Sequence, residues 1–285
     1  MPETDGEMGS NSASSRLQDV RMVPRDRIIV AKIGGSTLGS HDTTLEDIVR
    51  LHVDGFFPVI VHGGGKVITE WLARQQIPTK FARGLRVTDQ QSLEVVVAVL
   101  AGLVNKDLVA SIVRLGGRAV GISGVDGRIL LARPLDEDLG LVGEVVAVDT
   151  APIELLLAVG YIPVVAPIAI SHDGGSATLY NVNADTAAGQ LSAALGASRL
   201  IFLTDVPGIA NAAGQLCKSL TDREAASLIA KGVASGGMIP KIEACLAALQ
   251  VAEFAQIVDG RVPGALLDAV RGQSPGTVIR KDGSS

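Results

Sequence analysis

Apolar residues in this chain occur mainly in short unbroken runs that are separated by glycine, proline and charged residues. The clearest runs are residues 28–31, 57–61 and 199–204. An apolar run without polar alternation is typical of a strand buried on both faces, as in a parallel sheet covered by helices. Other runs predict further strands at residues 119–121, 162–166, 254–258 and 277–279, and one that begins at Leu179.

Segments with helical spacing alternate with these runs. Residues 43–53 and a segment through Trp71 to Gln75 predict two amphipathic helices. Thr88 and Gln91 have the spacing of a capping box, which predicts the start of a long helix. That helix has an apolar face wide enough to pack against both the sheet and a second subunit. The face consists of Leu93, Val96, Val97, Leu100, Leu103 and Val104.

The second half of the chain carries several helix boundary signals. Gly196 is placed to end an alanine-rich helix, and Pro240 is placed in a first helical turn. Thr221 and Glu224 form a second capping box. Between the predicted strands, residues 81–87 are expected to form a connection. Hairpins are expected over residues 124–148, with Asp126-Gly127 as a turn.

Repeated strand–helix–strand units of this kind predict an α/β fold, with a mostly parallel open sheet and helices on both faces. Residues 1–26 are rich in serine, glycine and charged residues and are expected to be a disordered tail. A change in composition near Gly196 suggests a boundary between one part at 27–195 and another at 196–285.

Composition narrows the class of protein. The 285 residues are 47% hydrophobic but only 3% aromatic, which predicts an aliphatic core. A net charge of -5 without a basic stripe argues against nucleic acid as a partner. Cys217 and Cys245 have neither disulfide-framework nor metal-ligand spacing. No leader is visible and the apolar runs are interrupted, so we expect a cytoplasmic protein without a membrane span or a metal site of its own.

The candidate chemistry lies where predicted strands end. Lys32-Ile33-Gly34-Gly35 follows the first strand, and His62-Gly63-Gly64-Gly65 follows the second. Asn181 to Asp185 follows a third strand and Asp205 a fourth. Ligands of open α/β sheets bind at this carboxyl edge, and glycine-rich turns there can hold phosphate through backbone N–H groups.

Each of these residues also has a purely structural interpretation. A lysine in a helix, such as Lys241, is ordinarily a solvated surface residue, and His62 could be a buried hydrogen-bonding residue. Asp185 at a helix start could be a cap. Lys32 is harder to explain in this way, because a charge after a buried strand is costly without a partner. Lys32 and Lys241 together could neutralise a transferring phosphoryl group.

The order of these motifs resembles that of the acetylglutamate kinases within the amino acid kinase family. The resemblance spans residues 27–280 and also includes Gly84-Leu85-Arg86-Val87-Thr88 and Gly236-Gly237-Met238-Ile239-Pro240-Lys241. It implies a three-layer α/β/α sandwich. Residues 27–195 would bind the acyl amino acid and form a homodimer, and residues 196–285 would bind ATP.

The resemblance also implies residue roles. Lys32, Lys241 and Asp185 would be catalytic, with Asp185 orienting the two lysines. The acyl-glutamate would be held by Gly64, Gly65, Arg86 and Asn181. The nucleotide would be held by Gly34, Gly35, Thr204, Asp205, Val206, Pro207, Gly208, Ile209, Val233, Ala234 and Ser235.

The implied activity is ATP-dependent phosphorylation of the γ-carboxylate of N-acetyl-L-glutamate, with Mg²⁺ carried on the nucleotide phosphates. Two alternatives stay open from the sequence. The acceptor could be a related acyl amino acid such as carrier-bound aminoadipate, or the chain could be a non-catalytic family member that senses a metabolite. Retention of Lys32, Asp185 and Lys241 argues against the second alternative, since a binding module needs no charge at a transition state.

Overall fold

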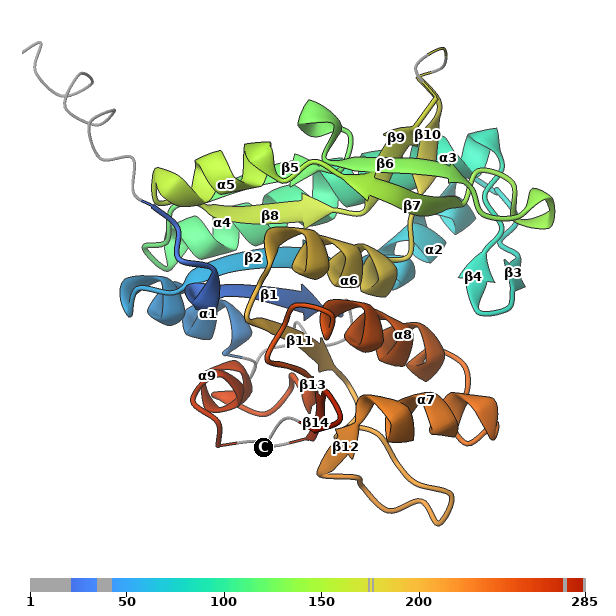
Figure 1. Ribbon diagram of the computed structural model, residues 1–285. Coiled ribbons are helices and arrows are strands. Elements are labelled where there is room, and N and C mark those ends of the chain that lie inside the picture. The colour runs from blue at the N-terminus through green and yellow to red at the C-terminus, as the bar shows by residue number, and fades with distance from the viewer. Residues whose placement is uncertain (1–21, 35–42, 174, 176, 274–275, 284–285) are drawn as a thin grey trace, which may run out of the picture.

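The computed structural model describes residues 22–34, 43–173, 175, 177–273 and 276–283. Most of the predicted tail at residues 1–26 lies outside this part. The centre of the molecule is an eight-stranded sheet in the order β12-β14-β13-β11-β1-β2-β8-β5, with neighbouring strands parallel except for the antiparallel pair β13–β14 (Figure 1). Its strands are β1 (Ile28–Ile33), β2 (Phe57–His62), β5 (Ala119–Ser123), β8 (Ile162–Ala166), β11 (Arg199–Thr204), β12 (Ser219–Thr221), β13 (Phe254–Asp259) and β14 (Thr277–Arg280).

Helices cover both faces of this sheet, which confirms the three-layer α/β/α prediction. Side chains of β1 alternate between two apolar cores: Ile29 and Ala31 join one, whereas Val30 joins the other. The first core is covered by α1 (Thr44–Val53), α4 (Asn105–Arg114) and α9 (Ala265–Val270). The second is covered by α5 (Ala151–Ala158), α6 (Ala184–Leu195), α7 (Asp222–Ala230) and α8 (Met238–Ala248).

Several boundary signals are confirmed. Gly196 ends α6 in the left-handed conformation, with φ 63°. Thr221 and Glu224 make both hydrogen bonds of the capping box of α7, and Pro240 lies in the first turn of α8. The sheet continues across residue 196, because β11 pairs with β1 in parallel register.

The region before α6 contains smaller β elements. A four-stranded sheet has the order β10-β9-β6-β7, and β3 pairs with β4 where the sequence predicted only a connection. The predicted Asp126-Gly127 hairpin turn is wrong, because Asp126–Arg128 is a short 3-10 helix between β5 and β6. These strands are β3 (Phe81–Ala82), β4 (Leu85–Arg86), β6 (Leu130–Pro134), β7 (Gly143–Val148), β9 (Ile168–Ser171) and β10 (Leu179–Asn181).

One continuous helix runs through α3 (Gln90–Val97), a π-helical segment (Ala98–Val104) and α4. The predicted cap at Thr88 is wrong, because the carboxylate of Asp89 accepts the N–H of Ser92 at 2.8 Å. The hydroxyl of Thr88 instead donates to the carbonyl of Arg86 at 2.9 Å. Thr88 and Asp89 are both cap-forming residue types, and tertiary contacts decide between them.

By length and composition, the helix Gln90–Arg114 is the one helix in the described part of the chain that could cross a membrane. This differs from the expectation that every apolar run is too short to span a membrane. Its buried residues Val96, Val99 and Leu100 pack against α2 (Gly65–Arg74) in a third apolar core. Packing inside the protein therefore accounts for part of its apolar character.

Candidate active site

Three charged side chains meet at the carboxyl edge of the central sheet. Lys32 Nζ lies 2.8 Å from Asp185 Oδ1, and Lys241 Nζ lies 2.9 Å from Asp185 Oδ2. Lys32 comes from the end of β1, Asp185 from the start of α6 and Lys241 from the start of α8. The structure therefore brings together all three residues that the sequence predicted as catalytic.

Close packing of two helices makes this meeting possible. A Cβ added to Gly189 of α6 would lie 2.8 Å from the Cβ of Ala244 on α8, so the helices touch at these two small residues. Asp185 precedes Gly189 by about one turn, and Lys241 precedes Ala244 by about one turn. The contact therefore places Asp185 and Lys241 beside each other at the same end of the two helices.

Asn183, not Asp185, is the N-cap of α6. Its Oδ1 accepts the N–H groups of Asp185 and Thr186 at 2.8 and 3.1 Å. The carboxylate of Asp185 is thereby left to bridge the two lysines. Burial alone would raise the pKa of Asp185, but the charges and hydrogen bonds of both lysines outweigh this, so its pKa lies below the ordinary value. Asp185 is an anion between two cations at neutral pH.

The glycine turn after β2 is supported by a buried polar network. His62 Nε2 lies 3.1 Å from Asn105 Nδ2, and His62 Nδ1 lies 3.1 Å from the carbonyl of Gly63. Asn105 Nδ2 also donates to the carbonyl of Val164 at 2.9 Å. Burial lowers the pKa of His62 to about 4, helped by the charges of Lys32 and Lys106 and opposed by the bond to Gly63. His62 is therefore neutral and structural, which agrees with its interpretation as a buried hydrogen-bonding residue.

This pKa predicts an acid-dependent loss of stability. Between pH 6.5 and pH 4 the unfolded chain protonates His62 and the folded chain does not, so the free energy of unfolding falls as the pH falls. From pH 7 to pH 5 we expect this histidine to account for about 2 kcal/mol. Urea denaturation at both pH values should show a smaller pH dependence in His62→Asn. The exposed His172→Asn is the matched control; an equal effect in both variants would contradict the assignment.

A cavity of about 340 Å³ begins beside these charges. Gly63 and Ala184 lie at the end nearest Asp185, and Arg86 and Asn181 also line the cavity. Gly64 is the N-cap of α2, so the first N–H groups of that helix have no intrahelical partner. A Cβ at Gly64 would lie 2.6 Å from Leu100, whereas a Cβ at Gly65 would meet nothing within 4 Å. The cavity thus combines free backbone donors with an apolar wall that includes Leu85, Leu100 and Val142.

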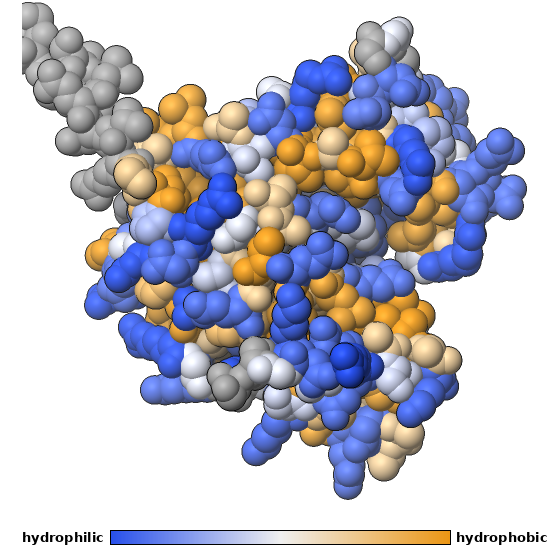
Figure 2. Space-filling view, viewed as in Figure 1, coloured by the Kyte–Doolittle hydropathy of each residue, from blue (hydrophilic) through white to orange (hydrophobic). Residues whose placement is uncertain are grey.

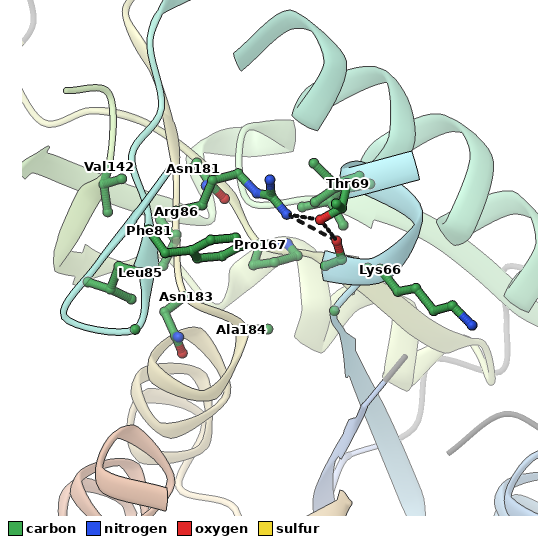
Figure 3. A pocket seen from close by; sticks show the side chains of 17 residues that line it. Lys66, Thr69, Phe81, Leu85, Arg86, Val142, Pro167, Asn181, Asn183 and Ala184 are labelled. Atoms are coloured by element: carbon green, nitrogen blue, oxygen red, sulfur yellow. Dashed lines mark hydrogen bonds between the residues drawn. The ribbon is translucent and has the colours of Figure 1, made fainter. Parts of the chain in front are cut away.

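Arg86 is the principal cation of this cavity, and it is 7% exposed. Its Nη2 donates to Thr69 Oγ1 at 2.8 Å and to the carbonyl of Gly65 at 3.0 Å, as Figure 3 shows. Its guanidinium lies 4.8 Å from the ring centroid of Phe81. Among the described residues Arg86 has no carboxylate partner. A buried, pre-positioned guanidinium without a counter-ion is suited to bind a ligand carboxylate.

Asn181 is linked to the same region from the opposite side. Its Nδ2 donates to Thr88 Oγ1 at 3.1 Å, and Thr88 in turn donates to the carbonyl of Arg86. Sequence reasoning missed Thr69 and Phe81 as partners of Arg86. The spacing of Thr69, one turn after Gly65, could have indicated that it faces the same side of α2.

The cavity opens into a wider cleft. A second space of about 610 Å³ adjoins it and shares Leu85, Val142 and Asn183 as lining residues. Its opposite wall is formed by Ile239 and Pro240 of α8. Figure 2 shows this face hollowed between its upper and lower halves. A small molecule can therefore enter the cavity from this cleft.

The residues predicted to bind the nucleotide are on the β11 side of the three charges. Gly34 N donates to the carbonyl of Leu203 at 3.1 Å, so the ends of β1 and β11 are adjacent. Gly35 lies outside the described residues. The segment from Thr204 to Ile209 leaves the end of β11, with Asp205, Val206 and Pro207 exposed and Gly208 and Ile209 buried. Val233, Ala234 and Ser235 lie between α7 and α8, and the carbonyl of Ser235 accepts the N–H of Met238.

Comparison with known proteins agrees with this architecture. A model of the amino acid kinase family matches residues 27–258. The chain belongs to this family. It is 42% identical over 257 residues to an acetylglutamate kinase of Dehalococcoides mccartyi, covering 89% of this chain and 94% of that one. It is 46% identical over 261 residues to the acetylglutamate kinase of Porphyra purpurea, covering 88% and 91%.

A solved structure extends the comparison. The N-acetylglutamate synthase of Neisseria gonorrhoeae, complexed with coenzyme A and N-acetyl-glutamate, has a TM-score of 0.78 and 28% identity to this chain. The match covers 95% of this chain and 64% of the synthase. The family fold thus extends over nearly all of the chain.

Proposed function

We propose that this protein is an ATP-dependent cytoplasmic kinase that phosphorylates the γ-carboxylate of N-acetyl-L-glutamate, a step of arginine biosynthesis. The observation that carries the proposal is the pairing of two lysines on Asp185, beside a cavity whose arginine has no carboxylate partner among the described residues. Relatives that are 42% and 46% identical over most of the chain are named acetylglutamate kinases. A structural neighbour that is 28% identical binds N-acetyl-glutamate.

The acceptor is held at one carboxylate so that the other can react. Arg86 binds the α-carboxylate, and Asn181 hydrogen-bonds the acylated amine. The γ-carboxylate then lies near Gly64 and Gly65, where free N–H groups of α2 stabilise negative charge. An N-acyl group suits the apolar wall formed by Leu85 and Val142 better than a free ammonium does.

Phosphoryl transfer to a carboxylate needs alignment and positive charge more than it needs proton transfer. The ordinary pKa of a glutamate side-chain carboxyl is about 4.3, so the acceptor is already ionised at neutral pH and no general base is required. Lys32 and Lys241 neutralise charge that develops on the transferring group and on the leaving oxygen. Asp185 holds both ammonium groups in place and is itself a positioning residue.

ATP occupies the β11 side of the site, against Gly34, Thr204 to Ile209 and Val233 to Ser235. The described residues contain no group of three or more His, Cys, Asp or Glu side chains that could form a metal cage. We infer that Mg²⁺ is carried on the nucleotide phosphates, where it would neutralise phosphate charge.

The test is a coupled ADP-release assay with N-acetylglutamate, glutamate, UMP and a carrier-bound aminoadipate as separate acceptors. We expect that N-acetylglutamate is the only one of these acceptors to be phosphorylated. Glutamate has a free ammonium in place of the N-acyl group that packs against the apolar wall. Turnover of a carrier-bound aminoadipate in preference to N-acetylglutamate would favour the related-kinase alternative. ATP binding without turnover of any acceptor would favour the metabolite sensor.

We also propose that the protein is a homodimer formed through the helix Gln90–Arg114. Leu103, Val113 and Leu115 on this helix or at its end are 40%, 54% and 36% exposed. An apolar groove of about 470 Å³ at the start of the same helix is lined by Leu93, Val97 and Leu179. A second copy of the same helix would bury these groups, since a self-complementary face requires no other partner. Light scattering of the free protein tests this, and a monomeric mass would contradict it.

A further inference from the structure

The segment between β11 and β12 is a short hairpin built on very few backbone contacts. Ala210 and Leu216 form one isolated antiparallel bridge, and Cys217 N donates to the carbonyl of Ile209 at 2.8 Å. The tip is closed by Asn211, whose Oδ1 accepts the N–H groups of Ala213 and Gln215. An isolated two-stranded hairpin is marginal by itself, so its position depends on what holds its base.

At the base of the hairpin, one side chain from the far end of the chain bonds both arms. Thr277, the first residue of β14, is fully buried, and its hydroxyl accepts the N–H of Ile209 at 2.8 Å. The same hydroxyl donates to the carbonyl of Cys217 at 2.6 Å. A hydroxyl has one donor and can also accept, so Thr277 uses both roles to join the two arms of the hairpin.

Gly208 shows how closely the preceding turn lies on this residue. A Cβ at Gly208 would be 2.5 Å from Thr277 Oγ1 and 3.0 Å from Thr277 N, and its φ is 147°. Only glycine permits this approach and this backbone conformation. The turn from Asp205 to Gly208 therefore packs directly against Thr277, and the next residue, Ile209, is hydrogen-bonded to the same side chain.

We propose that Thr277 is a positioning residue for the nucleotide. This inference rests on the proposed function, in which Thr204 to Ile209 binds ATP. Thr277 acts through Ile209 and Gly208 and fixes the conformation of the nucleotide-binding segment before ATP arrives. A pre-formed segment binds more tightly, because binding does not have to order it.

Thr277→Val tests this role, since valine has nearly the same shape and lacks the hydroxyl. We expect the Kd for ATP with Mg²⁺, measured by calorimetry without acceptor, to rise by roughly tenfold, the factor for about one hydrogen bond. The KM for N-acetylglutamate should change less than about twofold, because the acceptor cavity is on the β2 side. Thr277→Ser keeps the hydroxyl and should restore the Kd to near the wild-type value.

A purely structural Thr277 would give a different result. A lower melting temperature with an unchanged Kd for ATP would overturn the proposal. A serine variant that binds ATP as weakly as the valine variant would overturn it too. If valine prevents folding, Thr277→Cys replaces the hydroxyl by a thiol, a weaker hydrogen-bonding group, and should also raise the Kd for ATP. A wild-type protein that binds ATP but does not phosphorylate N-acetylglutamate would overturn the proposed acceptor alone and leave this test intact.

Discussion

Lys32→Ala and Lys241→Ala should each lower kcat by roughly 100- to 1,000-fold, the usual effect of removing one group that stabilises charge at a transition state. Each lysine also pairs with one oxygen of Asp185, at 2.8 and 2.9 Å. The acceptor KM should change less, because in the proposed function the acceptor is bound by Arg86 and Asn181. Lys32→Met and Lys241→Met fill more of the buried volume and should lose the same activity.

The measurement is kcat and both KM values, with thermal unfolding to confirm that each variant is folded. Lys80→Ala removes one exposed positive charge outside the site and is the matched control. A folded Lys32 or Lys241 variant with near-normal kcat would remove that residue from the mechanism. An equal loss of kcat in Lys80→Ala would indicate an effect of the protein's net charge, and not a specific interaction of Lys32 or Lys241 with the transferring phosphoryl group.

The sequence predicted seven of the eight central strands, because most of them are buried on both faces and leave a strong apolar pattern. It missed β12, which has three residues and an exposed Ser219. β1 and β2 end at Ile33 and His62, close to where their apolar runs end. Local signals also predicted boundaries where the deciding contact is local, as at Gly196 and in the Thr221–Glu224 box.

Predictions failed where a contact between distant segments decides the structure. The strands β3 and β4 have two residues each, too few for any periodicity, and Arg86 is fixed by Thr69, seventeen residues earlier. Thr88 is a good cap by type, yet its hydroxyl is bonded to Asn181 and Arg86.

Lys32, Asp185 and Lys241 show that the geometry of the site also depends on contacts between distant segments. Motif order indicated Lys32, Asp185 and Lys241, but no spacing reveals that Asp185 bridges both lysines. That arrangement depends on the contact of Gly189 with Ala244 and on Asn183 as the cap of α6. The cap interpretation of Asp185 was wrong because a better-placed neighbour has that role.

Arg86→Lys should raise the KM for N-acetylglutamate by roughly 10- to 100-fold, although the charge is retained. The guanidinium donates through Nη2 to Thr69 and Gly65 and lies against Phe81. Its Nη1 also donates to Thr79 at 3.4 Å, so the group is held in place with Nε and the second N–H of Nη1 left for a carboxylate. An ammonium group is a point charge without this fork and cannot keep all of these contacts.

The contacts of Arg86 are Thr69, Gly65, Thr79 and Phe81, all outside the segments proposed to bind the nucleotide, so the KM for ATP should change less than about threefold. Thr69→Val is the informative companion, since it removes one anchor of Arg86 and keeps the guanidinium; it should raise the acceptor KM by a smaller factor. Arg74→Lys, an exposed arginine at the end of the same helix, is the control. Equal losses of affinity for both substrates in Arg86→Lys would indicate a folding defect, and an unchanged acceptor KM would mean that the carboxylate is bound elsewhere.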